Sequence, residues 1–196
     1  MGLFRLYWIP RGADPAHGLY VRYPHRDLLD ILALESQRAA AYVVGEDLGT
    51  VEAQVREELA RRRVLSTRLL WFEERPPRDY PRESLAALTT HDLPTLAGVW
   101  DGSDSDAGIR ERLCRHAGLS GGESIEEVAE AAHRALAASP SRLLAATLED
   151  ALGVSERPNK PGTMTEWPNW SLALPLSVEE LEQAPGPARL ARALSR

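Results

Sequence analysis

The sequence predicts an α/β fold in which short strands alternate with helices. Residues 41–44 are apolar and end abruptly in a glycine and two acids, which predicts a buried strand. Residues 26–39 carry leucines and isoleucine on one broad face and predict a helix before that strand. Valine and leucine recur every four positions over 51–59 and predict a helix after it. This alternation favours a mainly parallel sheet with helices outside it.

The remaining elements continue this order along the chain. Thr50 is a candidate N-cap for the second helix, and residues 64–72 predict another strand. Residues 84–90 are ambiguous by propensity, but their abrupt polar end resembles that of the first strand. Residues 10–24 are rich in proline and glycine and are expected to form a surface loop. Further helices are expected at 108–117, 124–138, 177–184 and 187–195, the second of them opened by a capping box from Ser124 to Glu127.

Composition excludes several classes of protein. The 196 residues suffice for one domain, and a formal net charge of -6 disfavours nucleic acid as a partner, since phosphate binding needs an excess of Lys and Arg. Cys114 is the only cysteine, so an internal disulfide and a multi-cysteine metal site are excluded and a reducing cytoplasm is the expected location. No stretch approaches the roughly 20 apolar residues of a membrane span. The apolar start of the sequence is typical of a chain that begins inside a domain.

Glu46 is the first candidate for chemistry. It follows the predicted strand 41–45 within Gly45-Glu46-Asp47-Leu48-Gly49, where glycines on both sides favour a tight exit turn. In a β/α barrel, a carboxylate at the C-terminal end of a strand lies on the catalytic face. The alternative is a turn with two solvated acids that favour the N-terminus of the next helix.

Asp92 is the second candidate, and His91 precedes it. Both follow the predicted strand 84–90, and because equivalent ends of parallel strands share one rim, Glu46 and Asp92 are expected on one face. Two carboxylates on one face are what glycoside chemistry requires. The alternatives are that Asp92 caps the following helix and that His91 is an ordinary half-buried histidine.

Asn159 is the third candidate. It lies in Arg157-Pro158-Asn159-Lys160-Pro161-Gly162-Thr163, an exposed loop in which an amide could bond sugar hydroxyls; a rigid connector is the alternative. Tryptophans and tyrosines could stack on sugar rings, although most are expected to be core or loop anchors. Phosphate-binding and dinucleotide glycine motifs are missing, as is a histidine pair with zinc spacing, so neither a metal site nor a cofactor is predicted.

Together these motifs resemble the amylomaltase family, the 4-α-glucanotransferases. The resemblance is close over residues 1–102 and moderate over 141–175, whereas 103–140 match least and are expected to be a helical insertion or decoration. The motifs that carry it are Met1-Gly2-Leu3-Phe4-Arg5-Leu6-Tyr7-Trp8-Ile9-Pro10, Gly18-Leu19-Tyr20-Val21-Arg22-Tyr23-Pro24, Val44-Gly45-Glu46-Asp47-Leu48-Gly49-Thr50, Thr90-His91-Asp92-Leu93-Pro94-Thr95, and Asn159-Lys160-Pro161-Gly162-Thr163 with Pro168-Asn169-Trp170.

The resemblance implies a (β/α)8 barrel related to the α-amylases that transfers α-1,4-glucan segments between maltooligosaccharides by a retaining double displacement, without a cofactor. It makes Glu46 the general acid/base and Asp92 the stabiliser of the transition state. It makes His91 and Asn159 contacts to the substrate.

One departure from the family pattern limits this expectation. The family's nucleophile is an aspartate in an Arg-x-Asp-His-type segment that would come just before Met1. The chain is therefore expected to be the C-terminal part of the barrel, about four β/α units over residues 1–196, with the N-terminal half as its missing partner and with no activity alone. The alternatives are a fragment of an α-amylase-class hydrolase and a non-catalytic carbohydrate-binding remnant.

Overall fold

The computed structural model describes residues 1–104 and 106–196, so that Ser105 of the expected 103–140 insertion lies outside the described residues. The chain divides into two compact units, Met1–Thr67 and Arg68–Arg196. Strands of the main sheet pair in parallel in both units, β3 with β4 and β5 with β6. Parallel pairs among helices confirm the predicted α/β class.

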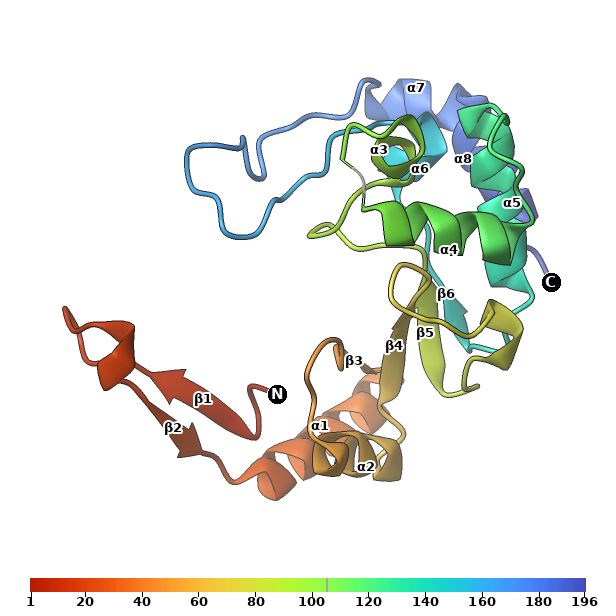
Figure 1. Ribbon diagram of the computed structural model, residues 1–196. Coiled ribbons are helices and arrows are strands. Elements are labelled where there is room, and N and C mark those ends of the chain that lie inside the picture. The colour runs from red at the N-terminus through yellow and green to blue at the C-terminus, as the bar shows by residue number, and fades with distance from the viewer. Residues whose placement is uncertain (105) are drawn as a thin grey trace. The chain divides into compact units, whose positions relative to one another are not determined.

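The first unit opens with a hairpin that the sequence pattern did not predict (Figure 1). Strand β1 pairs antiparallel with β2, which lies inside the predicted loop 10–24, so the prediction of a continuous loop is wrong. Cross-strand contact explains the difference, because Tyr7 packs on Tyr20 with ring centroids 5.0 Å apart. The elements of this unit are β1 (Arg5–Trp8), a 3-10 turn (η1, Pro15–His17), β2 (Leu19–Arg22), α1 (His25–Ala39), β3 (Val44–Gly45), α2 (Ala53–Arg61) and β4 (Leu65–Leu69), which crosses the boundary between the units.

Strand β3 is shorter and more exposed than predicted. Tyr42 is 65% exposed, and only Val44 and Gly45 pair in parallel with β4. The local reason is that Ala41 still belongs to the exit of α1, since its N–H donates to the Ser36 carbonyl and its carbonyl accepts from the Ser36 hydroxyl. The strand nevertheless ends directly before Glu46, as the sequence predicts.

Helix α1 is confirmed within one residue, but the expected start of α2 is wrong. Thr50 does not cap α2; the helix begins after Glu52, whose side chain makes no capping bond. Packing compensates for the missing cap. Glu58 on α2 is 3% exposed and accepts a 2.5 Å bond from Arg62, which also bonds Asp30 of α1.

The second unit contains an apolar core whose buried residues run from Leu70 to Leu190. Helix α5 packs against α4 and α8 (Figure 1). The capping box from Ser124 to Glu127 at its start is confirmed. Gly186 of α8 is required for close packing on α6, because a Cβ there would lie 2.0 Å from the Ala151 carbonyl oxygen. The elements are a 3-10 turn (η2, Pro77–Asp79), β5 (Ser84–Ala87), α3 (Leu96–Asp101), α4 (Ala107–Ala117), α5 (Ile125–Ala137), β6 (Leu143–Leu144), α6 (Leu148–Leu152), α7 (Val178–Gln183) and α8 (Pro185–Ala193).

Helix α3 is the helix that follows Asp92, and it begins later than a cap at Asp92 would place it. It has six residues, and Thr95 caps it by accepting a 3.1 Å bond from the Gly98 N–H. Within the described ranges, the helices are all too short or too polar to span a membrane.

Candidate functional site

Glu46 and Asp47 separate into two different environments in the first unit. Glu46 is exposed, whereas Asp47 is 3% exposed and accepts a 2.9 Å hydrogen bond from the Thr67 N–H. The Thr67 hydroxyl in turn donates to the Gly45 carbonyl at 3.1 Å. Asp47 thus joins the exit of β3 to β4, and Glu46 is the acid that faces solvent. The alternative of a turn with two solvated acids is wrong for Asp47, because Asp47 is buried.

Asp92 lies in the second unit, in the loop after β5. It is not the cap of α3, because Thr95 occupies that position. The Asp92 Oδ1 accepts a 2.6 Å bond from Asn159 Nδ2 and lies 3.3 Å from His91 Nε2. The structure therefore brings together three of the four predicted site residues, although Asn159 is 67 positions from Asp92 in the sequence.

The loop that carries Asn159 is closed at its base. The Trp170 N–H donates to the Pro158 carbonyl at 2.9 Å, and the Trp167 indole N–H donates to the Arg157 carbonyl at 3.1 Å. The Asn159 N–H also donates to the His91 carbonyl at 3.2 Å, so backbone and side chain both hold this loop to the loop after β5.

Trp170 is one of the aromatic residues that the sequence offers for stacking on sugar rings, and the structure places it beside His91. Its ring contacts His91 with centroids 5.0 Å apart, and it is 66% exposed. Its φ of 60° is in the left-handed region, which costs energy for a bulky residue, and strained residues of this kind cluster at functional sites. A hollow of about 280 Å³ adjoins it, lined by Thr89, Thr90, His91, Thr95, Thr147, Glu149, Pro158 and Trp170. Hydroxyl groups beside an exposed aromatic ring suit a polyhydroxylated ligand.

Two buried side chains, Trp71 and Thr89, support the loop after β5 that carries Asp92. The Trp71 indole N–H donates to the Pro94 carbonyl at 2.8 Å, and the Thr89 hydroxyl donates to the same oxygen at 2.9 Å. Asp150 on α6 accepts a 2.9 Å bond from the Leu96 N–H and so holds the first residue of α3. The residues around Asp92 are therefore anchored to the core of the second unit.

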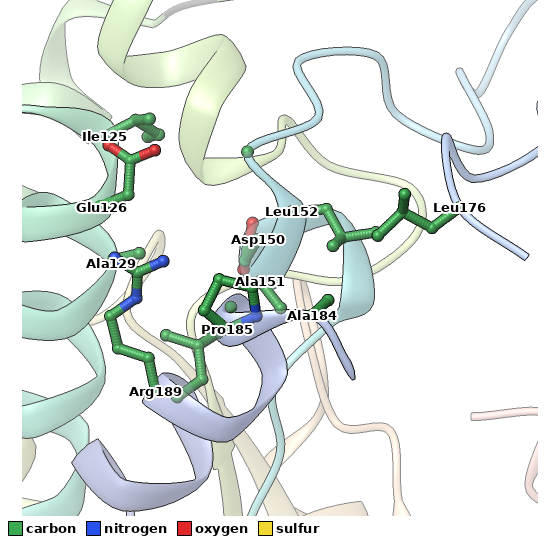
Figure 2. Close-up of a pocket in the computed structure, with 13 residues that line it drawn as sticks. Ile125, Glu126, Ala129, Asp150, Ala151, Leu152, Leu176, Ala184, Pro185 and Arg189 are labelled. Carbon is green, nitrogen blue, oxygen red and sulfur yellow. The ribbon is translucent and has the colours of Figure 1, made fainter. Parts of the chain in front are cut away.

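Asp150 also borders a second hollow, of about 190 Å³, between α5, α6 and α8 (Figure 2). Burial raises the pKa of Asp150 to about 6, against the opposing effect of its bonds from Leu96 and Thr147, and Glu149 raises it further. The charged side chains that border the hollow from the other helices are Glu126 of α5 and Arg189 of α8.

Asp150→Asn is expected to remove a pH dependence of stability. Because the folded-state pKa is raised, Asp150 contributes stability below its unfolded pKa near 4, and this contribution is lost as the pH rises through about 6. A pKa that rises from near 4 to about 6 on folding corresponds to roughly 3 kcal/mol in the free energy of unfolding. Urea unfolding at pH 4.5 and pH 7 should show a smaller loss of unfolding free energy between the two pH values for Asp150→Asn than for the wild type. Glu149→Gln removes only the smallest contribution to the raised pKa of Asp150, so it should reduce this loss only slightly. Equal losses for Asp150→Asn and wild type would contradict the assignment.

The structure groups no three His, Cys, Asp or Glu side chains that could hold a metal ion, among residues 1–104 and 106–196. The groups gathered around Asp92 are a carboxylate, an amide, an imidazole and an aromatic ring. Glu46 lies in the other unit, and its role together with Asp92 stays a prediction.

Comparison with known proteins gives a consistent result. A family model described as 4-alpha-glucanotransferase matches residues 1–177. The chain is 39% identical over 237 aligned positions to a 4-alpha-glucanotransferase of Mycobacterium tuberculosis, covering 99% of this chain and 32% of that protein. It is 34% identical to a 4-alpha-glucanotransferase of Haemophilus influenzae, with 90% of this chain and 31% of that protein covered. The chain thus spans about a third of the length of the curated relatives it matches.

Solved structures agree with the sequence relatives. The crystal structure of amylomaltase from Corynebacterium glutamicum is similar with a TM-score of 0.87 and 33% identity, over 100% of this chain and 34% of that one. Amylomaltase from Streptococcus agalactiae, solved in complex with acarbose, has a TM-score of 0.75 at 18% identity, over 99% of this chain and 39% of that one, which supports the fold alone.

Proposed function

Because this chain belongs to the 4-alpha-glucanotransferase family, we propose that it supplies part of the active site of an enzyme that transfers α-1,4-glucan segments between maltooligosaccharides. The observation that carries the proposal is the bond from Asn159 to Asp92 beside His91, since residues far apart in sequence converge on one carboxylate. A partly exposed carboxylate held by an amide can accept hydrogen bonds from two sugar hydroxyls.

The roles proposed for these residues follow from what a retaining transfer requires. It needs one carboxylate as nucleophile and one carboxylic acid, about 5–5.5 Å away, that protonates the leaving oxygen. We assign protonation to Glu46, which is exposed directly after β3. Asp92 would strengthen its bonds to the sugar hydroxyls as the ring approaches an oxocarbenium ion, with His91 and Asn159 as further substrate contacts. We assign the nucleophile to no residue of this chain, so a carboxylate outside residues 1–196 would have to supply it.

The same proposal extends to the architecture. We infer that β3, β4, β5 and β6 contribute to a (β/α)8 barrel, because short parallel strands each followed by a polar loop are the units of that fold. Residues 103–140 are proposed to be a helical addition to it, since α4 and α5 run in succession with no strand between them.

A hybrid protein tests the function directly. This chain would replace the matching third of the amylomaltase from Corynebacterium glutamicum, and the hybrid would be incubated with maltotriose. The proposal predicts both glucose and dextrins longer than maltotriose. Products that are only shorter than maltotriose would indicate a hydrolase, and binding of maltotriose without turnover would indicate a non-catalytic carbohydrate-binding protein.

The 196-residue chain on its own is expected to show no turnover. Its proposed residues supply a proton donor and a stabiliser, and a retaining reaction does not proceed without attack by a second carboxylate. The chain and its Glu46→Gln variant, each incubated with maltotriose, should therefore give the same background of products. Turnover clearly above the variant would overturn this expectation.

A further inference from the structure

A short segment, residues 155–159, lies along α3 and is fastened to it at successive points. The Thr95 hydroxyl donates to the Ser155 carbonyl at 2.9 Å, and the Ser155 hydroxyl donates to Asp101 at 2.7 Å. Gly98 permits this approach, because a Cβ at that position would come within 2.7 Å of the Ser155 carbonyl oxygen. The path of this segment is therefore set by α3 before it reaches the candidate site.

Arg157 is the next point of attachment, and it bonds two groups at once. Its Nε and Nη2 donate to the two carboxylate oxygens of Asp104 at 2.5 and 2.7 Å. Its Nη1 donates to the main-chain carbonyl of Asp92 at 2.9 Å. The side chains of Arg157 and Asp104 are only 12% and 24% exposed. A planar guanidinium held on two oxygens has a fixed direction, so the third bond is also directed.

Two groups of Asp92, its main-chain carbonyl and its carboxylate, are therefore bonded by residues that lie two positions apart in the sequence. Arg157 binds its carbonyl, and Asn159 binds its carboxylate. We propose that Arg157 and Asp104 form a positioning pair that orients the Asp92 carboxylate for sugar hydroxyls, an inference that rests on the function proposed above. Neither residue is expected to touch the sugar, because both side chains are largely buried and three of the five N–H donors of Arg157 are directed at Asp104 and Asp92.

The position of Asp92 explains why such a pair is required. Its side chain is 44% exposed and lies in a loop, between the end of β5 and the start of α3. A group that recognises a transition state must hold its geometry within about 0.5 Å, and loops achieve this only with support from other elements. Asp104 supplies that support from the connection between α3 and α4.

Nuclear magnetic resonance of the full 196-residue chain tests the positioning itself. The Asn159 side-chain amide reports the bond to Asp92, and its signals should move in Arg157→Gln and in Asp104→Asn. The double variant should move them no further than Arg157→Gln, because the two residues act as one unit. Arg157→Lys should recover thermal stability but not the wild-type signal, since an ammonium lacks the planar fork.

Arg112→Gln is the matched control. Arg112 also joins a carboxylate to a main-chain carbonyl in the second unit, with 2.6 Å bonds to Glu74 and to the Trp71 carbonyl. It should lower stability comparably and leave the Asn159 signals in place. Unchanged Asn159 signals in Arg157→Gln, or an equal change in Arg112→Gln, would overturn the positioning pair.

Binding of maltoheptaose separates this inference from the proposed function. The dissociation constant should rise about tenfold in Arg157→Gln and in Asp104→Asn, the loss typical of one well-made charged hydrogen bond, and stay unchanged in Arg112→Gln. Wild type that binds no maltoheptaose would count against the proposed function, while the amide signals still decide the positioning. Wild-type affinity in Arg157→Gln would contradict the positioning pair and leave the proposed function standing.

Discussion

Glu46→Gln is expected to reduce transfer by the hybrid protein by a factor of about 10² to 10⁴, which is the usual contribution of general acid–base catalysis. Glutamine keeps the size and polarity of the side chain but has no acidic proton to transfer to the leaving oxygen. Because Glu46 is exposed and the hydrogen bond that joins the exit of β3 to β4 is accepted by Asp47, the variant should fold as the wild type does. The measurement is the initial rate of glucose release from maltotriose.

The choice of donor makes this prediction specific to proton transfer. Fluoride leaves a maltosyl fluoride with little need of protonation. The Glu46→Gln variant should therefore react with maltosyl fluoride at a rate much closer to the wild-type rate than it does with maltotriose. Glu57→Gln, an equal change of charge at an exposed position of α2, should retain full activity. An equal loss with both donors would show that Glu46 is not the proton donor.

Trp71→Ala is expected to cost the second unit roughly 3–5 kcal/mol, or about 6 to 20 °C in melting temperature. Trp71 is 1% exposed in the apolar core, and its indole N–H donates to the Pro94 carbonyl. Alanine would leave a cavity and would also release the loop two residues after Asp92. The same variant should therefore weaken maltoheptaose binding beyond what stability alone explains.

Trp71→Phe and Trp170→Ala serve as controls for that experiment. Phenylalanine fills most of the volume without the N–H, so it should show an intermediate loss of stability. Trp170 is 66% exposed, and its removal should change the melting temperature little. A melting temperature of Trp71→Ala within one degree of wild type would show that Trp71 does not anchor the loop.

Local patterns predicted most of the elements. Helices α1, α4 and α5 were predicted within one residue, because apolar spacing and the Ser124–Glu127 box are properties of neighbouring residues. Strand β2 and the length of β3 were not predicted, since a strand of two to four residues exists only through its partner. Alternation of a few side chains does not specify that partner.

The sequence by itself determined the candidates for chemistry, which stay a prediction: Glu46, His91, Asp92 and Asn159 all stand in polar turns that follow apolar runs or lie between prolines. Only the tertiary structure decided how they are held. Asn159 bonds Asp92 across 67 positions of the sequence, and Arg157 bonds Asp104 across 53. Asp47 is buried and accepts a hydrogen bond from β4, while the adjacent Glu46 is exposed. The physical reason is that turn chemistry depends on a few consecutive residues, whereas a hydrogen bond between distant loops depends on the packing of α3 and the core beneath it.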